Sequence, residues 1–143
     1  MRSLFESTPT FELTEERGHL AIHVPRPGLV VTRLRGHFSS AFAAQIETVG
    51  EREMPRGAFV GLHEWTETTS FDLSVPTTLG AWSMRRLASI ARIVIATTHP
   101  IVGLAVRTAN LTIKRIEHLD SAVALERIVE EELSRPLVRV ARR

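Results

Sequence analysis

The chain has 143 residues, of which 43% are hydrophobic and 24% are charged, and this composition is typical of one soluble domain that can bury a core without disulfides or metals. It carries 18 basic and 16 acidic residues, so the net charge is only +2, and arginines interspersed with glutamates argue against a nucleic-acid-binding surface. The absence of cysteine excludes disulfides, thiol catalysis and thiolate metal sites.

Two further observations concern targeting. No hydrophobic run approaches the ~20 residues that a membrane-spanning helix requires. The first residues lack the apolar core of a signal peptide, so a cytoplasmic location is predicted. Residues 1–9 show no periodicity and end at a proline, which predicts a flexible N-terminal lead.

Short strands separated by turns open the predicted domain. Alternation of apolar and polar side chains predicts strands over residues 10–14, 19–24 and 29–34. Gly18 and Gly28 close the two intervening turns, and Gly36 is expected to end the third strand. Three strands joined by short turns predict an antiparallel meander. From residue 37 the period becomes helical, with a start at Ser39 or Ser40 and an end near Gly50.

A strand–helix–strand unit occupies the centre of the chain. Runs of β-branched and apolar residues predict buried strands over residues 58–64 and 92–97. Between them lie a polar loop over residues 65–75 and an amphipathic helix over residues 76–91, with Pro76 in its first turn. Two buried strands joined by a helix predict a right-handed parallel crossover.

The last third of the chain predicts a short helix, a strand and a closing helix. The short helix follows Pro100, and the strand covers residues 112–118. Asp120 or Ser121 caps the closing helix, which ends at Pro136. Residues 136–143 then form a basic C-terminal tail. The elements predict one α/β domain over residues 10–135, with a mixed sheet of about six strands and about four helices.

The sequence offers little catalytic chemistry. The six histidines show no metal-ligand spacing, and His19 and His23 would lie roughly 13 Å apart along one strand, so no metal site is predicted. No nucleophile elbow and no glycine-rich phosphate loop is present. An enzyme that uses Glu64, Glu67 or His63 is therefore the least favoured hypothesis, and neither an activity nor a cofactor is predicted.

The predicted loop over residues 65–75 is the candidate functional segment. It is long, rich in hydroxyl groups, and follows the carboxyl end of a central strand, where α/β folds place their sites. Trp65 and Phe71 either anchor this loop in the core or bind a partner or ligand, and the sequence leaves both interpretations open.

In element order the chain resembles the STAS and SpoIIAA-like domains, which include bacterial anti-sigma-factor antagonists and a STAS/SEC14-like branch. The resemblance covers residues 11–133 and rests on the strands at 59–62 and 93–95 and on the run from Ile113 to Ala122, which is similar to the family's closing strand and helix. The extra opening strand and the long loop look more like the SEC14-like branch.

Phosphorylatable members of that family carry a Ser or Thr and a Gly directly after the central strand, at the start of the next helix. A phosphate is favourable there because a helix N-terminus attracts negative charge. In this sequence Glu64 ends the strand, but the matching residues are displaced to Thr77, Thr78 and Gly80. The resemblance therefore implies Thr77, Thr78 and, less directly, Ser74 as phosphosite candidates.

The resemblance implies a non-enzymatic regulatory domain that binds a protein partner, such as an anti-sigma kinase or another signalling protein. The alternative is a carrier or sensor of an apolar small molecule or lipid, held beneath the Trp65–Phe71 segment. A homodimer is compatible with either function, and the sequence does not decide it. The residues expected to bind the partner or ligand are Glu64, Trp65, Phe71, Ser74, Thr77, Thr78 and Trp82.

Overall fold

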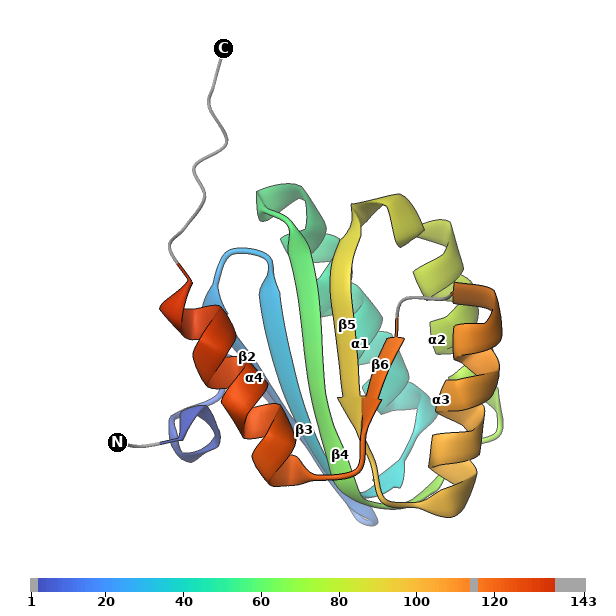
Figure 1. Ribbon diagram of the computed structural model, residues 1–143. Helices are drawn as coiled ribbons and strands as arrows, with labels where there is room; N and C mark the ends of the chain where they lie inside the picture. The colour runs from blue at the N-terminus through green and yellow to red at the C-terminus, as the bar shows by residue number, and fades with distance from the viewer. Residues whose placement is uncertain (1–2, 114–115, 136–143) are drawn as a thin grey trace.

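The computed structural model describes residues 3–113 and 116–135 and contains one mixed six-stranded sheet covered by helices on both faces (Figure 1). The strands are β1 Phe11–Glu15, β2 Gly18–Arg26, β3 Leu29–Phe38, β4 Phe59–Phe71, β5 Ile90–Ala96 and β6 Ile116–Leu119. The helices are α1 Ser40–Glu53, α2 Ser74–Arg85, α3 Pro100–Ile113 and α4 Ala122–Ser134, and single 3-10 turns form at Leu4–Glu6, Met54–Arg56 and Leu87–Ser89. None of the described helices is long and apolar enough to cross a membrane.

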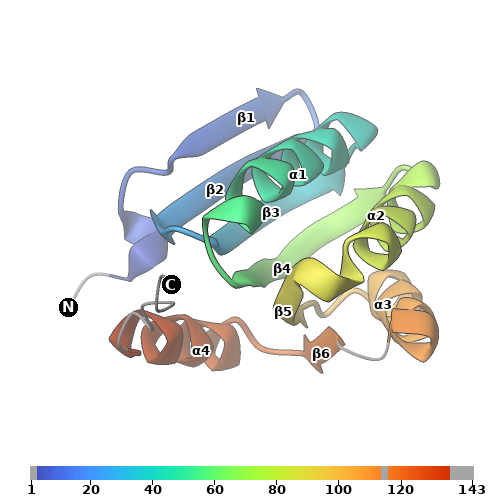
Figure 2. The same cartoon turned by 90° about the horizontal axis from the view of Figure 1, so that it is seen from above.

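The order of the strands in the sheet is the order in the chain, β1-β2-β3-β4-β5-β6. The first three strands pair antiparallel and the last four pair parallel, which confirms the predicted meander and crossover units. Right-handed crossovers that all advance in one direction place their helices on the same face of a sheet. Accordingly the helices α1, α2 and α3 cover one face, and α4 covers the other (Figure 2).

Two hydrophobic cores result, one on each side of the sheet. Successive residues of a strand point to opposite faces, so Val30 packs under α1 while Val31 packs under α4. The larger core contains the aromatic residues of β4, α1 and α2, and the smaller core is aliphatic, with Leu125 and Val129 of α4 at its centre. Leu4 and Phe5 of the N-terminal lead pack against the smaller core.

The predicted loop over residues 65–75 is wrong, because β4 continues as a strand to Phe71. Its partner β3 also continues beyond Gly36, and His37 pairs with Ser70 and Phe38 with Phe71. Threonine, tryptophan and phenylalanine all favour extended backbone, so this hydroxyl-rich stretch is suited to a strand once a partner strand is available. The helix α2 then starts at Ser74 and ends at Arg85, and β5 begins at Ile90.

Gly36 lies within β3 and does not end it. Its φ of 81° is open to glycine, and a Cβ atom there would lie 2.3 Å from the carbonyl oxygen of Arg17. The pairing with β4 shifts register directly after Gly36. A glycine in a strand pattern therefore marks an irregularity that lets the β1–β2 turn approach β3.

Other boundaries also differ from the predictions. The helix after Pro100 has 14 residues and includes residues 112 and 113, which were assigned to a strand, so β6 starts only at Ile116. Ser39 caps α1 by accepting a hydrogen bond from Phe42 N, and Ser121 caps α4 in the same way from Ala124 N. The predicted helix end at Pro136 and the basic tail lie outside the described residues.

Candidate functional site

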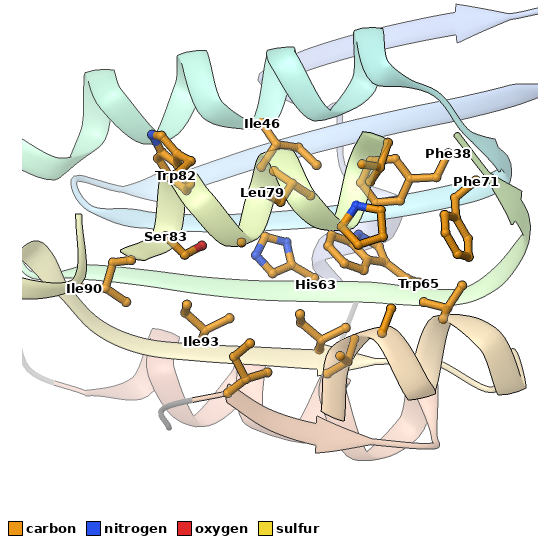
Figure 3. A pocket seen from close by; sticks show the side chains of 18 of the residues that line it. Phe38, Ile46, His63, Trp65, Phe71, Leu79, Trp82, Ser83, Ile90 and Ile93 are labelled. Atoms are coloured by element: carbon orange, nitrogen blue, oxygen red, sulfur yellow. The ribbon is translucent and has the colours of Figure 1, made fainter. Parts of the chain in front are cut away.

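A cavity of about 110 Å³ lies between the sheet and the helices α1, α2 and α3 (Figure 3). The strands β3, β4, β5 and β6 supply its floor, and the three helices supply its walls. Its aromatic lining is Phe38, Phe59, Trp65, Phe71 and Trp82, and the remaining lining is mostly aliphatic. An engineered apolar cavity of roughly 150 Å³ binds benzene. This cavity is smaller but only partly enclosed, so one ring or the end of a longer molecule would fill it and extend toward its opening.

The floor follows from the alternation of β4. Phe59, Gly61, His63 and Trp65 share one face of the strand and line or border the cavity, while Glu64 points to the other face. Gly61 makes room for the imidazole ring, since a Cβ atom on Gly61 would lie 2.9 Å from His63 Nε2. The His63 and Trp65 rings are 4.8 Å apart, and Phe38 meets Trp65 edge-on at 4.9 Å.

A short chain of hydrogen bonds fixes these rings. Trp65 Nε1 donates to Thr32 Oγ1 at 3.0 Å, and Thr32 Oγ1 is 2.7 Å from His63 Nδ1. Thr32 lies on β3 and is fully buried, and His63 is only 7% exposed. Burial lowers the pKa of His63 to about 4, so the imidazole ring is neutral at physiological pH. The cavity therefore contains a neutral histidine held in one orientation by a threonine on the neighbouring strand.

On α2, the indole of Trp82 is fixed from outside the cavity. Its Nε1 donates to Glu51 Oε1 at 2.9 Å, and Arg86 donates to the same oxygen at 2.7 Å. These bonds lower the pKa of the Glu51 carboxyl, with the Arg86 bond as the largest cause. The polar edge of Trp82 is thus satisfied, and only its apolar surface faces the cavity.

A second polar cluster joins the ends of β3 and β4 beside Phe38 and Phe71. His37 Nδ1 is 2.7 Å from Ser70 Oγ, and His37 Nε2 is 2.8 Å from Asp72 Oδ1. Asp72 Oδ2 accepts a hydrogen bond from Ser40 N at 2.8 Å, at the start of α1. This backbone bond, followed by the bond from His37, lowers the pKa of Asp72. The cluster ties two strands to a helix at the edge of the cavity.

This cluster has the residue types of a hydrolytic triad with the imidazole nitrogens exchanged. In serine hydrolases Nε2 faces the serine and Nδ1 faces the carboxylate, whereas here Ser70 faces Nδ1 and Asp72 faces Nε2. The second oxygen of Asp72 is occupied by the α1 backbone. The arrangement explains how the edge of the cavity is held, and no reaction follows from it.

The structure brings together three of the seven residues predicted to bind a partner or ligand. Trp65, Phe71 and Trp82 line the cavity. Glu64 is buried on the opposite face, where it pairs with Arg33 Nε at 3.2 Å. Ser74, Thr77 and Thr78 are exposed on the first turns of α2, and their role as phosphosites stays a prediction.

Sequence reasoning missed the role of His63, Thr32 and Phe38. His63 was considered as a catalytic group or metal ligand, but its neighbours Gly61 and Trp65 were assigned to different elements. The period-2 pattern from Phe59 to Trp65 would have placed them on one face. Within the described residues, no group of three or more histidine, aspartate or glutamate side chains could hold a metal ion.

Comparison with known proteins identifies the fold. No protein-family profile matches the sequence, and no curated protein matches it. Solved structures do match, including an uncharacterized protein of the DUF3478 family with a SpoIIAA-like fold from Shewanella loihica PV-4. The TM-score is 0.58 at 15% identity, over 79% of this chain and 95% of that one. The protein has the STAS/SpoIIAA-like fold.

A second solved structure agrees with this assignment. The anti-sigma factor antagonist SpoIIAA, in its unphosphorylated form, matches with a TM-score of 0.56 at 13% identity, over 81% of this chain and 99% of SpoIIAA. The resemblance stated from the sequence is therefore confirmed for the fold. At these identities a common fold carries no site residues with it, so the function of this SpoIIAA-like domain rests on its own side chains.

Proposed function

We propose that this SpoIIAA-like domain is a non-enzymatic binding protein that holds a small apolar molecule between the sheet and α1–α3. The carrying observation is the cavity of about 110 Å³ with aromatic walls and one buried, oriented histidine. Well-packed domains contain few voids larger than a water molecule, and apolar cavities with a few placed polar groups are typical ligand sites.

The direct test is extraction of the protein purified under native conditions from its own organism. Native mass spectrometry should show extra mass that disappears on denaturation, and organic extraction should recover a compound above background. A bare protein that also fails to bind ring-sized probes such as toluene would contradict the proposal.

A variant sharpens this test. Ala105 of α3 lines the cavity, and Ala105→Phe should fill it and abolish probe binding. Ala44→Phe introduces the same ring at an exposed position of α1 and should bind the probe like the unmodified protein. Equal binding by both variants would place the probe outside the cavity.

A protein-docking regulator is the second candidate. It is favoured by the exposed apolar side chains of Leu73 and Ile101, which are 88% and 60% exposed, and by the shared fold with an anti-sigma factor antagonist. Affinity purification from the native organism should return a specific partner that is lost on Leu73→Asp with Ile101→Asp. Return of the same proteins by the double variant would argue against this surface.

A further inference from the structure

Two polar side chains line the cavity, Ser83 of α2 and His63 of β4, and the histidine is the one that its neighbours hold in a fixed orientation. Two hydrogen bonds converge on the hydroxyl group of Thr32, one from Trp65 Nε1 and one shared with His63 Nδ1. Indole N–H is only a donor, so it occupies a lone pair of the Thr32 oxygen. The described residues offer the Thr32 hydroxyl proton no other acceptor than His63 Nδ1.

This arrangement fixes the tautomer of the histidine. The Thr32 hydroxyl donates to Nδ1, and a neutral imidazole that accepts at Nδ1 carries its proton on Nε2. The ring is neutral because burial holds the pKa of His63 at about 4. Trp65 Nε1–H therefore donates to Thr32 Oγ1, and the Thr32 O–H donates to His63 Nδ1. The Nε2–H group of His63 is the last donor of this chain.

Nε2–H lies at the surface of the cavity and forms no hydrogen bond with the described residues. His63 is only 7% exposed, and its ring lines the cavity together with Leu79 and Ser83 (Figure 3). Donors that lie away from bulk water are almost always paired in proteins, so an oriented donor that faces an apolar cavity favours a ligand that brings a hydrogen-bond acceptor.

The surroundings restrict the chemistry of the acceptor. No charged side chain lines the cavity in the described part of the chain, so a carboxylate would be buried without a counter-ion. A pure hydrocarbon would leave Nε2–H unpaired. A neutral carbonyl oxygen on an apolar body satisfies both conditions.

Building on the proposed function, we infer that the cavity selects a neutral, ring-sized molecule with one carbonyl oxygen that accepts a hydrogen bond from His63 Nε2–H. The ligand class is a small ketone, aldehyde or ester. Fatty acids and other carboxylates are excluded because the described residues that line the cavity offer no counter-ion. Plain hydrocarbons are disfavoured because they leave Nε2–H without an acceptor. Thr32 acts as a positioning residue, because it sets the tautomer without touching the ligand.

The test compares probes of matched shape by calorimetric titration. Acetophenone carries the carbonyl, α-methylstyrene replaces its oxygen with a methylene group, and benzoate carries a charge. Acetophenone should bind about tenfold to a hundredfold more tightly than α-methylstyrene, and benzoate should not bind measurably. His63→Phe keeps a ring in place and should abolish the difference between the two neutral probes.

A spectroscopic measurement keeps the inference falsifiable even if His63→Phe fails to fold. Long-range ¹H–¹⁵N spectra of the unmodified protein should show His63 as the Nε2–H tautomer, with the Nε2 proton shifting when acetophenone binds. An Nδ1–H tautomer would overturn the inference. Thr32→Val should weaken this preference for one tautomer.

The outcomes separate the two proposals. Equal affinity for acetophenone and α-methylstyrene would overturn the carbonyl preference and leave the apolar binding function standing. Failure of all three probes, together with an empty native extract, would overturn both proposals. Tighter binding of benzoate than of acetophenone would overturn the neutral-ligand selection.

Discussion

At the scale of single residues, two glycines on neighbouring helices have opposite surroundings. On α1, a Cβ atom at Gly50 would lie 2.5 Å from a ring carbon of Trp82. On α2, a Cβ atom at Gly80 would meet nothing within 4 Å. The sequence predicts that this helix ends near Gly50, but α1 continues to Glu53. Gly50 therefore allows Trp82 to pack closely and does not terminate the helix. The wall of the cavity therefore depends on a missing side chain.

Gly50→Ala is predicted to destabilise the protein. Alanine gains up to about 1 kcal/mol in a helix, but overpacking against an indole that Glu51 holds in place costs about 1–3 kcal/mol. The net loss should appear in urea unfolding, with a change in Trp fluorescence as Trp82 moves. The matched Gly80→Ala should instead stabilise by about 0.5–1 kcal/mol, since only the backbone term remains. An increase in the free energy of unfolding of Gly50→Ala would show that the Trp82 side chain moves away from the added methyl group at little cost.

A pH dependence follows from Asp72. Its pKa is lowered in the folded state by the Ser40 backbone bond and by His37, so the ionised form stabilises the fold above the unfolded pKa. That contribution is lost as the pH falls through the folded-state pKa, below about pH 4. Urea unfolding from neutral to acidic pH should show this loss, and Asp72→Asn should flatten that part of the curve. An unchanged profile in the variant would assign the acid sensitivity to other groups.

The sequence predicted the site only in part, for reasons visible at particular residues. Trp65, Phe71 and Trp82 stand out because large aromatic residues in a polar stretch must be buried somewhere. Glu64 was grouped with them by proximity, yet the strand period sends it to the other face. Thr32 could not have been predicted, because its role depends on the pairing of β3 with β4 and on a histidine 31 residues away.

At the scale of elements, α4 is attached to the sheet through a buried carboxylate. Glu132 is 2% exposed, and its side chain pairs with Arg26 of β2 at 3.0 Å and Arg92 of β5 at 3.1 Å. Arg26 also donates to the Glu132 carbonyl oxygen at 2.6 Å. Arg92 binds Glu117 as well, which lowers the pKa of that carboxyl. One glutamate thus joins the last helix to two strands that are not neighbours.

Glu132→Ala is predicted to cost about 1.5–3 kcal/mol, because it removes the charge-assisted hydrogen bonds of Glu132 to two partly buried arginines. Chemical unfolding monitored by circular dichroism would measure the loss. Glu130→Ala, on an exposed position of the same helix, should change the free energy of unfolding by no more than about 0.5 kcal/mol. Similar effects of the two substitutions would show that the arginines find water or other partners.

The elements themselves were largely predictable, and the failures share one cause. Sequence patterns found the six strands and the four helices and included Ser39 and Ser121 among the alternative caps, because these features depend on local periodicity and capping. The extension of β4 to Phe71 depends on β3 extending beside it, which is tertiary information. The length of α3 was missed since Thr112 and Ile113 favour strands locally but end a helix here.

At the scale of the whole molecule, the sheet separates the cavity from the core beneath α4. A ligand that binds only the folded state stabilises the whole cooperative domain by mass action. At a concentration of acetophenone one hundred times its Kd, the expected gain is about 2.7 kcal/mol, and the melting temperature should rise by several degrees. Ala105→Phe should unfold cooperatively, but acetophenone should not raise its melting temperature. A rise of equal size in both proteins would indicate unspecific binding.

The one-way order of the strands has a consequence for biosynthesis. Each new strand pairs with the strand made just before it, so the sheet is able to grow from β1 toward β6 while the ribosome is still translating. Once α3 has formed, the face that carries the cavity still needs Ile116 of β6, whereas of the described residues only Leu4 and Phe5 cover the opposite face until α4 arrives. Nascent chains stalled before residue 122 should therefore expose the aliphatic face of the sheet to chaperones. This exposed surface should be covered only when α4 has emerged from the ribosome and packed on the sheet.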